Sequence, residues 1–366
     1  MHVLITSDTV GGVWTYTQEL VTGLVDAGHR ITLVSFGKLP APHQTTWMHT
    51  LPGLDYRPTE YRLEWMEVAE KDIDESKRYL ELLISEVQPD VLHFSQYCYG
   101  DIATAIPKVV VAHSDVVSWW MAVHQKEPDD TPWMCRYREM VINGLRGADV
   151  MVAPSQWMLD ALAQHYLHAK EGVVVYNGRT TALFDPCAGK EDFVLSVGRL
   201  WDAAKQVSLL LEPDQRARTC IVGWEREPGR EGTGYSARVP ANVDLLGPKS
   251  QTDLRALYSS AAIYAATSRY EPFGLSPLEA ALSRCALVLN DNPVFHELWG
   301  DAGVYFAKDD GKDLARVIAE LRENPEMRFE YAERAYQTAH KKFSAARMVD
   351  EYEQIYQEVA LPARVA

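Results

Sequence analysis

The strongest constraint in this sequence is a pattern that occurs twice along the chain. A short run of aliphatic and β-branched residues is followed by a turn rich in Gly, Ser or Asn and then by a stretch with helical periodicity. Continuous apolar runs of this length indicate strands buried on both faces, and their alternation with helices predicts βαβ units around a parallel sheet. The runs are 2–7, 31–36, 91–95, 109–114, 149–155 and 173–178 in the first series, and 193–199, 219–224, 243–247, 262–268, 286–291 and 303–307 in the second.

Two series of βαβ units predict two domains. The chain has 366 residues, and a typical domain has about 150. We therefore expect an α/β protein in which two Rossmann-like, doubly wound domains face each other across a cleft. The first domain is assigned to 1–178 and 344–366, the linker to the polar stretch 179–191, and the second domain to 192–343. The end of the chain is expected to form a helix that crosses back to the first domain, with an apolar stripe made of Met348, Tyr352, Ile355, Tyr356 and Val359.

Charge and cysteine content exclude several classes of protein. The chain carries 36 basic and 51 acidic residues, a net charge of −15, and no basic run suited to nucleic acid. No apolar stretch reaches the ~20 residues of a membrane span, and Met1 leads into a strand without a signal peptide, so we expect a cytoplasmic protein. Five scattered cysteines without C-x-x-C spacing indicate reduced thiols rather than disulfides or a zinc site.

The turn after the first strand contains Gly11 and Gly12 and opens a helix. Paired glycines let backbone N–H groups approach an anion at the positive end of a helix, so a phosphate could bind here. A tight turn without a ligand is an equally good interpretation. A nicotinamide site would need G-x-G-x-x-G and an acidic residue after the second strand, whereas that strand ends Phe36-Gly37-Lys38.

Two cations follow the first strand of the second series. Arg199 comes directly after Gly198, and Lys205 lies six residues further on. Arginine can grip a phosphate through its planar fork and lysine as a point charge, so the two suit a diphosphate. Taken alone, the pair is also consistent with two solvated surface residues.

The segment 268–280 is the most specific part of the sequence. A strand ends, a loop with Pro and Gly follows, and Ser276 with Pro277 at the first helical position is expected to start a helix. Ser276 and Glu279 have the spacing of a capping box, in which Glu279 would bond the N-cap backbone N–H. Glu271 has no such structural role and could accept hydrogen bonds from sugar hydroxyls.

Glu271 and Glu279 resemble the Glu-x7-Glu motif of the retaining family 4 glycosyltransferases, which have the GT-B fold. Other short motifs of this chain occur in the same order as in that family, along almost its whole length. Members often carry Gly before the strand after the motif helix, where this chain has Ser283 to Ala286. The further matching positions are Gly11-Gly12, His113, Pro154-Ser155, Tyr176-Asn177-Gly178, Gly198-Arg199 with Lys205, and Glu297.

The resemblance implies roles in binding a nucleoside-diphosphate sugar, with UDP or GDP as the expected nucleotide. Arg199 and Lys205 would stabilise the leaving diphosphate in place of a metal, and Glu271 would hold the sugar. Glu279 would bind the ribose, with the capping role as the competing interpretation. The remaining donor contacts implied are His113, Gly11, Gly12, Gly198 and the backbone N–H groups of Phe273, Gly274 and Leu275.

The resemblance also implies a metal-independent front-face displacement that retains the anomeric configuration. Positioning and electrostatic stabilisation would then carry the catalysis. The acceptor, a small molecule or glycan, is expected on the side of the first domain near Trp14, Tyr97 and Asp115, although aromatic residues there could equally be packing residues. The acidic amphipathic stretch 60–87 would be repelled by anionic membranes, which favours a soluble acceptor.

Two rival functions stay open from the sequence. An epimerase-type GT-B enzyme would need its own acid and base carboxylates, and a non-catalytic nucleotide-sugar-binding protein would not need Glu271, Arg199 and Lys205 together. The base and the sugar of the donor are expected to be selected by loop residues such as 224–236, which the sequence does not place.

Overall fold

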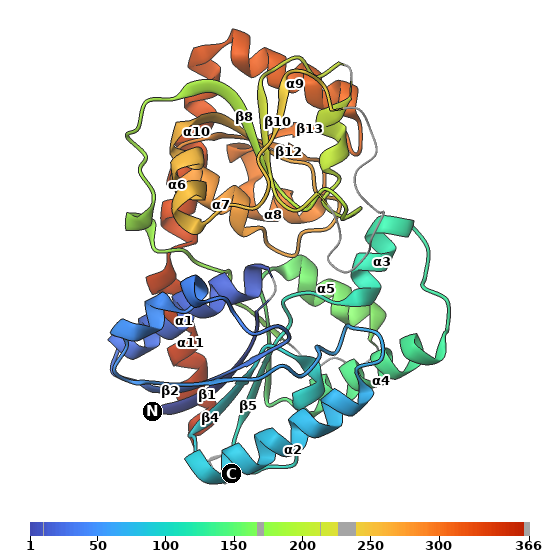
Figure 1. The fold of residues 1–366 in the computed structure, drawn as a ribbon, viewed down its shortest axis with the longest axis vertical. Helices are drawn as coiled ribbons and strands as arrows, with labels where there is room; N and C mark the ends of the chain where they lie inside the picture. Colours follow the sequence, from blue (N-terminus) through green and yellow to red (C-terminus); the bar gives the residue numbers. More distant parts are fainter. Residues whose placement is uncertain (10, 167–171, 213, 226–238, 362–366) are drawn as a thin grey trace. The chain divides into compact units, whose positions relative to one another are not determined.

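The computed structural model describes residues 1–9, 11–166, 172–212, 214–225 and 239–361. They form two compact units, each built on a parallel sheet with helices on its faces (Figure 1). The first unit comprises Met1–Met121, Lys126–Gly178 and Ala345–Ala366, and the second comprises Ala122–Gln125 and Arg179–Ser344. The two-sheet α/β architecture predicted from the sequence is confirmed.

The sheet of the first unit contains, within the described residues, seven parallel strands in the order β3-β2-β1-β4-β5-β6-β7. The chain adds strands on one side of β1 and then returns to its other side with β4, so the topology reverses between β1 and β4. The strands are β1 (His2–Asp8), β2 (Arg30–Phe36), β3 (Leu54–Pro58), β4 (Val91–Phe94), β5 (Lys108–Val111), β6 (Val150–Ala153) and β7 (Gly172–Val174).

Successive residues of β1 point to opposite faces of this sheet, as strand geometry requires. Val3 and Ile5 join a core with α1 and α11, whereas Leu4 joins a core with α2, α4 and α5. Both faces are therefore buried, which is why these strands appear in the sequence as unbroken apolar runs. The helices are α1 (Gly12–Asp26), α2 (Glu70–Val87), α3 (Val116–His124), α4 (Pro132–Gly147), α5 (Gln156–His165) and α11 (Ala345–Ala360), with short 3-10 turns η1 (Pro42–Gln44), η2 (Thr46–Thr50) and η3 (Tyr97–Tyr99).

The second unit has a six-stranded sheet in its described residues, again all parallel, in the order β10-β9-β8-β11-β12-β13. Here the topology reverses between β8 and β11. The strands are β8 (Glu191–Val197), β9 (Thr219–Val222), β10 (Val243–Leu245), β11 (Ala261–Ala266), β12 (Ala286–Asn290) and β13 (Val304–Phe306). The helices are α6 (Gln251–Ser260), α7 (Leu275–Leu282), α8 (Pro293–Trp299), α9 (Gly311–Glu323) and α10 (Pro325–Lys342), with 3-10 turns η4 (Thr181–Leu183), η5 (Val207–Leu211) and η6 (Gly300–Ala302).

Each run expected from the sequence contains a strand, and the structure adds β3, which the sequence pattern did not reveal. β3 contains Asp55, Arg57 and Pro58, and it lies at the edge of the sheet. An edge strand needs no apolar run and tolerates Pro, so it lacks the signal of a buried strand.

Residues 179–191, expected as a linker, belong to the second unit in the structure, as does Ser344. The Arg179 N–H donates to the carbonyl of Phe343 at 3.0 Å, and Arg179 and Ser344 form an isolated parallel β-bridge. β8 also begins at Glu191, inside this stretch. Apart from the short segment Ala122–Gln125, the chain therefore passes between the units directly after Gly178 and directly after Ser344.

Helix α11 lies beside α1 on the first sheet (Figure 1). Met348, Tyr352, Ile355 and Tyr356 are buried there, and Val359 is partly buried against the same core. Among the residues that the structure describes, no helix is long and apolar enough to cross a bilayer.

We expect the contact between α1 and α11 to depend on Gly23. A methyl group added at Gly23 would overlap Cγ2 of Val349, a β-branched side chain that is buried and cannot move aside easily. Gly23→Ala should therefore lower the free energy of unfolding by about 1–3 kcal/mol through overpacking, reduced by up to about 1 kcal/mol of helix propensity.

In the Val349→Ala background the overlap disappears, and Gly23→Ala should become stabilising by about 1 kcal/mol. Urea unfolding of the four proteins measures both changes. If Gly23→Ala changed the free energy of unfolding in the same direction in both backgrounds, the proposed overlap between Gly23 and Val349 would be refuted.

Candidate functional site

The cations and the first carboxylate singled out in the sequence lie on two loops of the second unit. Arg199 and Lys205 follow β8, and Glu271 follows β11, the strand hydrogen-bonded to β8. These two strands flank the point where the strand order reverses. In open α/β sheets ligands bind at the carboxyl ends of the strands at such a point, because the loops on either side diverge there.

Lys205 and Glu271 form an ion pair, with 2.5 Å between Lys205 Nζ and Glu271 Oε2. The same carboxylate oxygen accepts a hydrogen bond from the Ser268 hydroxyl at 3.2 Å. Both side chains of the ion pair are partly buried, with 24% and 16% of their surface exposed. The structure thus brings together two residues that are 66 positions apart in the sequence.

Arg199 is directed by Asp202 on the same loop. Its guanidinium NH2 group lies 2.6 Å from Asp202 Oδ2, and the guanidinium also lies over the ring of Trp201 at 5.0 Å. The other oxygen of Asp202 accepts the Ala204 N–H at 2.9 Å, which shapes the loop. Asp202 is almost buried, whereas the Arg199 side chain is 41% exposed. The loop therefore presents a fixed cation to solvent.

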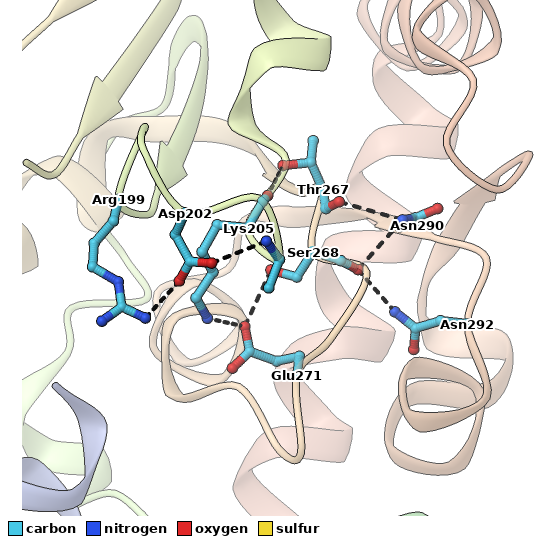
Figure 2. A network of polar contacts seen from close by, with 9 residues as sticks. Arg199, Asp202, Lys205, Thr267, Ser268, Glu271, Asn290 and Asn292 are labelled. Atoms are coloured by element: carbon cyan, nitrogen blue, oxygen red, sulfur yellow. Dashed lines mark hydrogen bonds and ion pairs between the residues drawn. The ribbon is translucent and has the colours of Figure 1, made fainter. Parts of the chain in front are cut away.

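A scaffold of polar contacts joins the two loops (Figure 2). The Thr267 hydroxyl donates to the Lys205 carbonyl at 2.8 Å, and the Arg269 N–H donates to the Ala204 carbonyl at 2.8 Å. Asn290 and Asn292, at the end of β12, donate through their side-chain amides to the carbonyl of Ser268 at 3.3 and 3.1 Å. Three neighbouring strand ends are thus tied together beneath the ion pair.

Two glycines allow this close approach. Gly198 lies against Val207 and Lys205, where a Cβ would stand 3.1 Å from Val207 Cγ2. Gly274 has a φ of 92°, in the left-handed region that favours glycine. A Cβ on Gly274 would also stand 3.0 Å from the Glu271 side chain.

Helix α7 begins two residues earlier than the sequence analysis expected, which placed Pro277 at the first helical position. It runs from Leu275, with Gly274 at its N-cap, so Ser276 and Pro277 lie inside its first turn. Ser276 is therefore not the N-cap, and the predicted capping box with Glu279 is wrong. The chain enters the helix at Gly274, which is in the left-handed conformation. The sequence predicts Ser276 as the N-cap because Ser is frequent at that position.

Glu279 is buried and pairs with Arg179. The Arg179 Nε atom lies 3.0 Å from Glu279 Oε1, and the two side chains are only 3% and 7% exposed. Arg179 also lies against the ring of Phe184. The second carboxylate of the motif is thus connected to the residue at which the chain enters the second unit.

Arg284 lies in the run 283–286 between α7 and β12, the run in which the sequence departs from the pattern of the resembled family. It adopts a φ of 56°, the left-handed conformation that ends a helix and that side chains disfavour. Its guanidinium pairs with Glu333 at 3.1 Å and lies over the ring of Tyr336 at 4.6 Å, both on α10. These contacts offset the backbone strain at Arg284.

His113 follows β5 in the first unit. Its Nε2 lies 3.3 Å from the Ser95 hydroxyl, and its ring meets the edge of Tyr16 at 4.5 Å between centroids. Burial lowers the pKa of His113 well below its ordinary value. Burial also lowers the pKa of the neighbouring His93 to about 3, with a smaller contribution from His113. Both imidazoles are therefore neutral at physiological pH.

Gly11 and Gly12 lie at the beginning of α1, and both are exposed. Gly11 is the N-cap with a φ of 75°, and no side chain among the described residues caps the helix there. The first turn of a helix leaves backbone N–H groups without intrahelical partners, and the role of Gly11 and Gly12 in binding an anion stays a prediction.

The three residues expected on the acceptor side are all buried within the first unit. The Trp14 indole donates to the Gln44 carbonyl at 3.2 Å, and the Tyr97 hydroxyl donates to the Ser114 carbonyl at 3.0 Å. Asp115 accepts the Ser118 N–H at 2.9 Å and the Tyr166 hydroxyl at 2.8 Å. The structure therefore gives these three residues packing and capping contacts, rather than an exposed binding surface.

Some expectations cannot be placed. Residues 226–236 of the loop expected to select the base and the sugar lie outside the described residues. Within the part of the chain that the structure describes, no three His, Cys, Asp or Glu side chains gather as metal ligands would.

Sequence reasoning missed Asp202, Asn290, Asn292 and Arg179. Asp202 could have been found, because it stands between the two predicted phosphate ligands. The other three act on residues distant in sequence, and no local pattern marks them.

The sequence matches two family models in succession. Residues 10–183 match the model described as Glycosyltransferase Family 4, and residues 185–338 match that described as Glycosyl transferases group 1. The boundary between the models falls close to the passage between the two structural units.

Curated relatives are distant but extend along the chain. The lipopolysaccharide core biosynthesis mannosyltransferase LpcC of Rhizobium leguminosarum bv. viciae is 27% identical over 202 residues, 48% of this chain and 56% of that protein. This chain thus spans little more than half the length of that relative. The phosphatidyl-myo-inositol mannosyltransferase of Mycolicibacterium smegmatis is 25% identical over 358 residues, 91% of this chain and 87% of that protein.

Solved structures share the fold. A sucrose-phosphate synthase from Thermosynechococcus elongatus has a TM-score of 0.78 at 15% identity, with 98% of both chains covered. HepE of Anabaena in complex with UDP and glucose has a TM-score of 0.75 at 16% identity, with 98% of this chain and 100% of that chain covered. The two halves of the chain thus match two glycosyltransferase family models in succession, and the two units have the fold of the GT-B glycosyltransferases.

Proposed function

We propose that this protein is a retaining glycosyltransferase that moves a hexose from a nucleoside-diphosphate sugar to a hydroxyl group of an acceptor. The observation that carries this proposal is the placement of the Lys205–Glu271 ion pair and of Arg199 on the two loops at the reversal point of the second sheet. Two cations and one carboxylate in that place suit a ligand with a diphosphate at one end and sugar hydroxyls at the other.

Arg199 and Lys205 hold the diphosphate of the donor. As the bond between the sugar and the phosphate breaks, negative charge grows on the phosphate oxygens, and fixed cations stabilise that charge more than the ground state. Asp202 keeps Arg199 in position before the ligand arrives. These cations supply the charge that a metal ion would otherwise supply, so the proposed reaction needs no metal.

Glu271 accepts hydrogen bonds from the hydroxyls of the donor sugar. Its present contact with Lys205 opens when the diphosphate draws the lysine, which frees carboxylate oxygens for the sugar. The backbone N–H groups of Phe273, Gly274 and Leu275, at the beginning of α7, face the same ligand by this assignment. His113, neutral through burial, contributes a hydrogen bond to the sugar, and Gly11 and Gly12 contribute N–H groups.

The reaction proceeds on one face of the sugar. The diphosphate leaves first, the ring carbon gains positive charge, and the acceptor hydroxyl enters from the side that the diphosphate leaves. The acceptor proton passes to a leaving phosphate oxygen, so the new glycosidic bond keeps the original configuration. Positioning and electrostatics then suffice, and no carboxylate attacks the sugar.

The named relatives support a hexose donor. LpcC and the Mycolicibacterium relative are mannosyltransferases, and HepE is described with UDP and glucose. We therefore propose a UDP- or GDP-linked hexose. For the acceptor we propose a soluble molecule, because α2 presents exposed Glu70 and Asp74 where docking on an anionic membrane would need cations.

Removing either charge of the central pair should abolish most of the activity. Lys205→Met and Glu271→Gln should each lower turnover of the donor about 100-fold to 1,000-fold, the usual cost of losing one group that stabilises developing charge. Release of nucleotide from the donor measures this loss. Because most of each side chain is buried, losing one partner should also lower the free energy of unfolding by about 1–3 kcal/mol, so turnover is compared at a temperature at which each variant is folded. Lys312→Met, at an exposed lysine of α9, is the matched control, and near-native turnover in either site variant would contradict the assignment.

Donor binding should be selective for one nucleotide and independent of divalent metal. A ligand that binds the folded state alone raises the thermal midpoint by mass action. In a panel of UDP-, GDP- and ADP-sugars we expect one nucleotide class to raise the midpoint, by the same amount with and without EDTA. A shift that EDTA removes would refute the metal-independent assignment.

Glu279 is proposed to bind the ribose while Arg179 holds its carboxylate in place. Loss of a hydrogen bond to a charged group should weaken binding by roughly tenfold or more. The nucleoside diphosphate should therefore bind more weakly when its 2′- or 3′-hydroxyl is removed. The ratio of the dissociation constants of the deoxy and the complete nucleotide should be smaller in Glu279→Gln than in the native chain. Calorimetry measures the four affinities. A difference that stays at full size in the variant would assign Glu279 to structure alone.

Folding is the control for this comparison. Glu279→Gln leaves the Arg179 guanidinium buried without its partner charge, which should cost about 3–5 kcal/mol of stability. The double variant with Arg179→Gln removes both charges and should recover much of that loss. Affinities are then compared in proteins that are fully folded at the temperature of the assay.

A further inference from the structure

The first unit contains a cavity of about 250 Å³ that the proposed donor chemistry does not use. Its walls come from the segment that leads into α2, the first turns of α2, the residue that follows η3 and Gly100, and the face of α4 from Trp133 to Asn143. In a βαβ unit these parts lie at the carboxyl edge of the strands, where α/β sheets bind ligands. The volume lies below the roughly 300 Å³ where pockets for drug-sized ligands begin, which suits a ligand of about one ring.

Aromatic and aliphatic side chains form part of the wall. The rings of Trp133 and Tyr137 stack at 5.8 Å with an angle of 22°, and both residues line the cavity together with Ile73, Met66 and Met140. Tyr137 is buried, whereas Trp133 is only partly buried. A flat aromatic surface beside flexible methionines packs well against the C–H face of a sugar ring.

The charged residues of the cavity favour a ligand without negative charge. Lys77 pairs with Asp101 at 2.7 Å, and Arg136 pairs with Glu70, so both cations of the wall are neutralised by carboxylates. Asp74 and Glu139 line the same cavity and are exposed. These two carboxylates would repel a phosphate and would accept hydrogen bonds from hydroxyl groups.

The back of the cavity is rigid. The buried carboxylate of Glu64 accepts the N–H groups of Tyr97 and Cys98 at 3.0 and 2.7 Å. On the other side of η3, Gly144 of α4 approaches the Tyr97 carbonyl so closely that a Cβ would overlap it. The cavity is therefore held open by backbone contacts and needs little ordering on binding.

We propose that this cavity binds an uncharged sugar ring, and that this ring belongs to the acceptor. The assignment of the ring to the acceptor rests on the proposed transferase function, whereas the binding of an uncharged sugar ring does not. The buried Trp14, Tyr97 and Asp115 are then scaffold residues, and Trp133 with the exposed carboxylates of Asp74 and Glu139 recognises the acceptor.

Saccharide binding to the full chain tests the proposal directly. The probes are methyl mannoside, methyl glucoside and maltose, with glucose 6-phosphate as the charged counterpart, and saturation-transfer NMR with titration gives the dissociation constants. We expect at least one neutral probe to bind and glucose 6-phosphate to bind at least tenfold more weakly.

Trp133→Ala should weaken the neutral probe about fivefold to tenfold, the range of one aromatic contact. The matched control is Phe329→Ala, an aromatic residue of α10 that is 65% exposed and far from the cavity in sequence. The proposal would be overturned if Trp133→Ala bound the neutral probe as tightly as the native chain does. It would also be overturned if glucose 6-phosphate bound more tightly than the neutral probes, or if no probe bound.

Hydrolysis of the donor separates this proposal from the proposed function. Water replaces the acceptor in that reaction, so hydrolysis of the donor by the native chain reports on the donor site without the cavity. A native chain that turns over the donor but binds no neutral probe refutes the acceptor cavity alone. A native chain that binds the probe but turns over no donor refutes the transferase function alone.

Discussion

The proposed chemistry of this protein depends on β8 and β11 being neighbours in the second sheet. Each strand ends in a loop with one half of the site, and the reversal of strand order between them makes the loops diverge around a shared space. The contact of Lys205 with Glu271 joins the two halves, and the amides of Asn290 and Asn292 fix the loop that carries Glu271. A phosphate and a sugar can then be held by groups that are positioned before the ligand arrives, which is the condition for electrostatic catalysis.

A second constraint is the buried pair of Arg179 and Glu279. A buried ion pair seldom adds stability, because the loss of hydration offsets the attraction of the charges. This pair links Glu279, which we propose binds the ribose, to Arg179, where the chain enters the second unit. The Phe273 ring of the donor loop also packs on Phe343, whose carbonyl receives the Arg179 N–H. The end of the loop that carries Glu271 and the helix that follows it thus contact the segments through which the chain passes between units.

The first unit combines polar groups that are buried with a cavity that is open. His113 and His93 lie among tyrosines of α1 and α11 and stay neutral, so they can exchange hydrogen bonds without bringing charge to the sheet edge. The cavity between α2 and α4 presents the opposite character, with Trp133 and exposed carboxylates. Anionic donor recognition in one unit and recognition of an uncharged acceptor in the other would keep the two substrates from competing for one site.

The amino-acid sequence by itself determined the two parallel sheets, because strands buried on both faces must be apolar throughout, and it determined the positions of Arg199, Lys205 and Glu271 after such strands. It could not reveal β3, whose place at the sheet edge requires no apolar pattern, or the true beginning of α7 at the left-handed Gly274. Only the tertiary structure decided that Glu279 is buried against Arg179, because no local sequence signal marks contacts between residues so far apart in the chain. It alone assembled the α2–α4 cavity, since strand pairing places those helices side by side and the sequence separates them by more than forty residues.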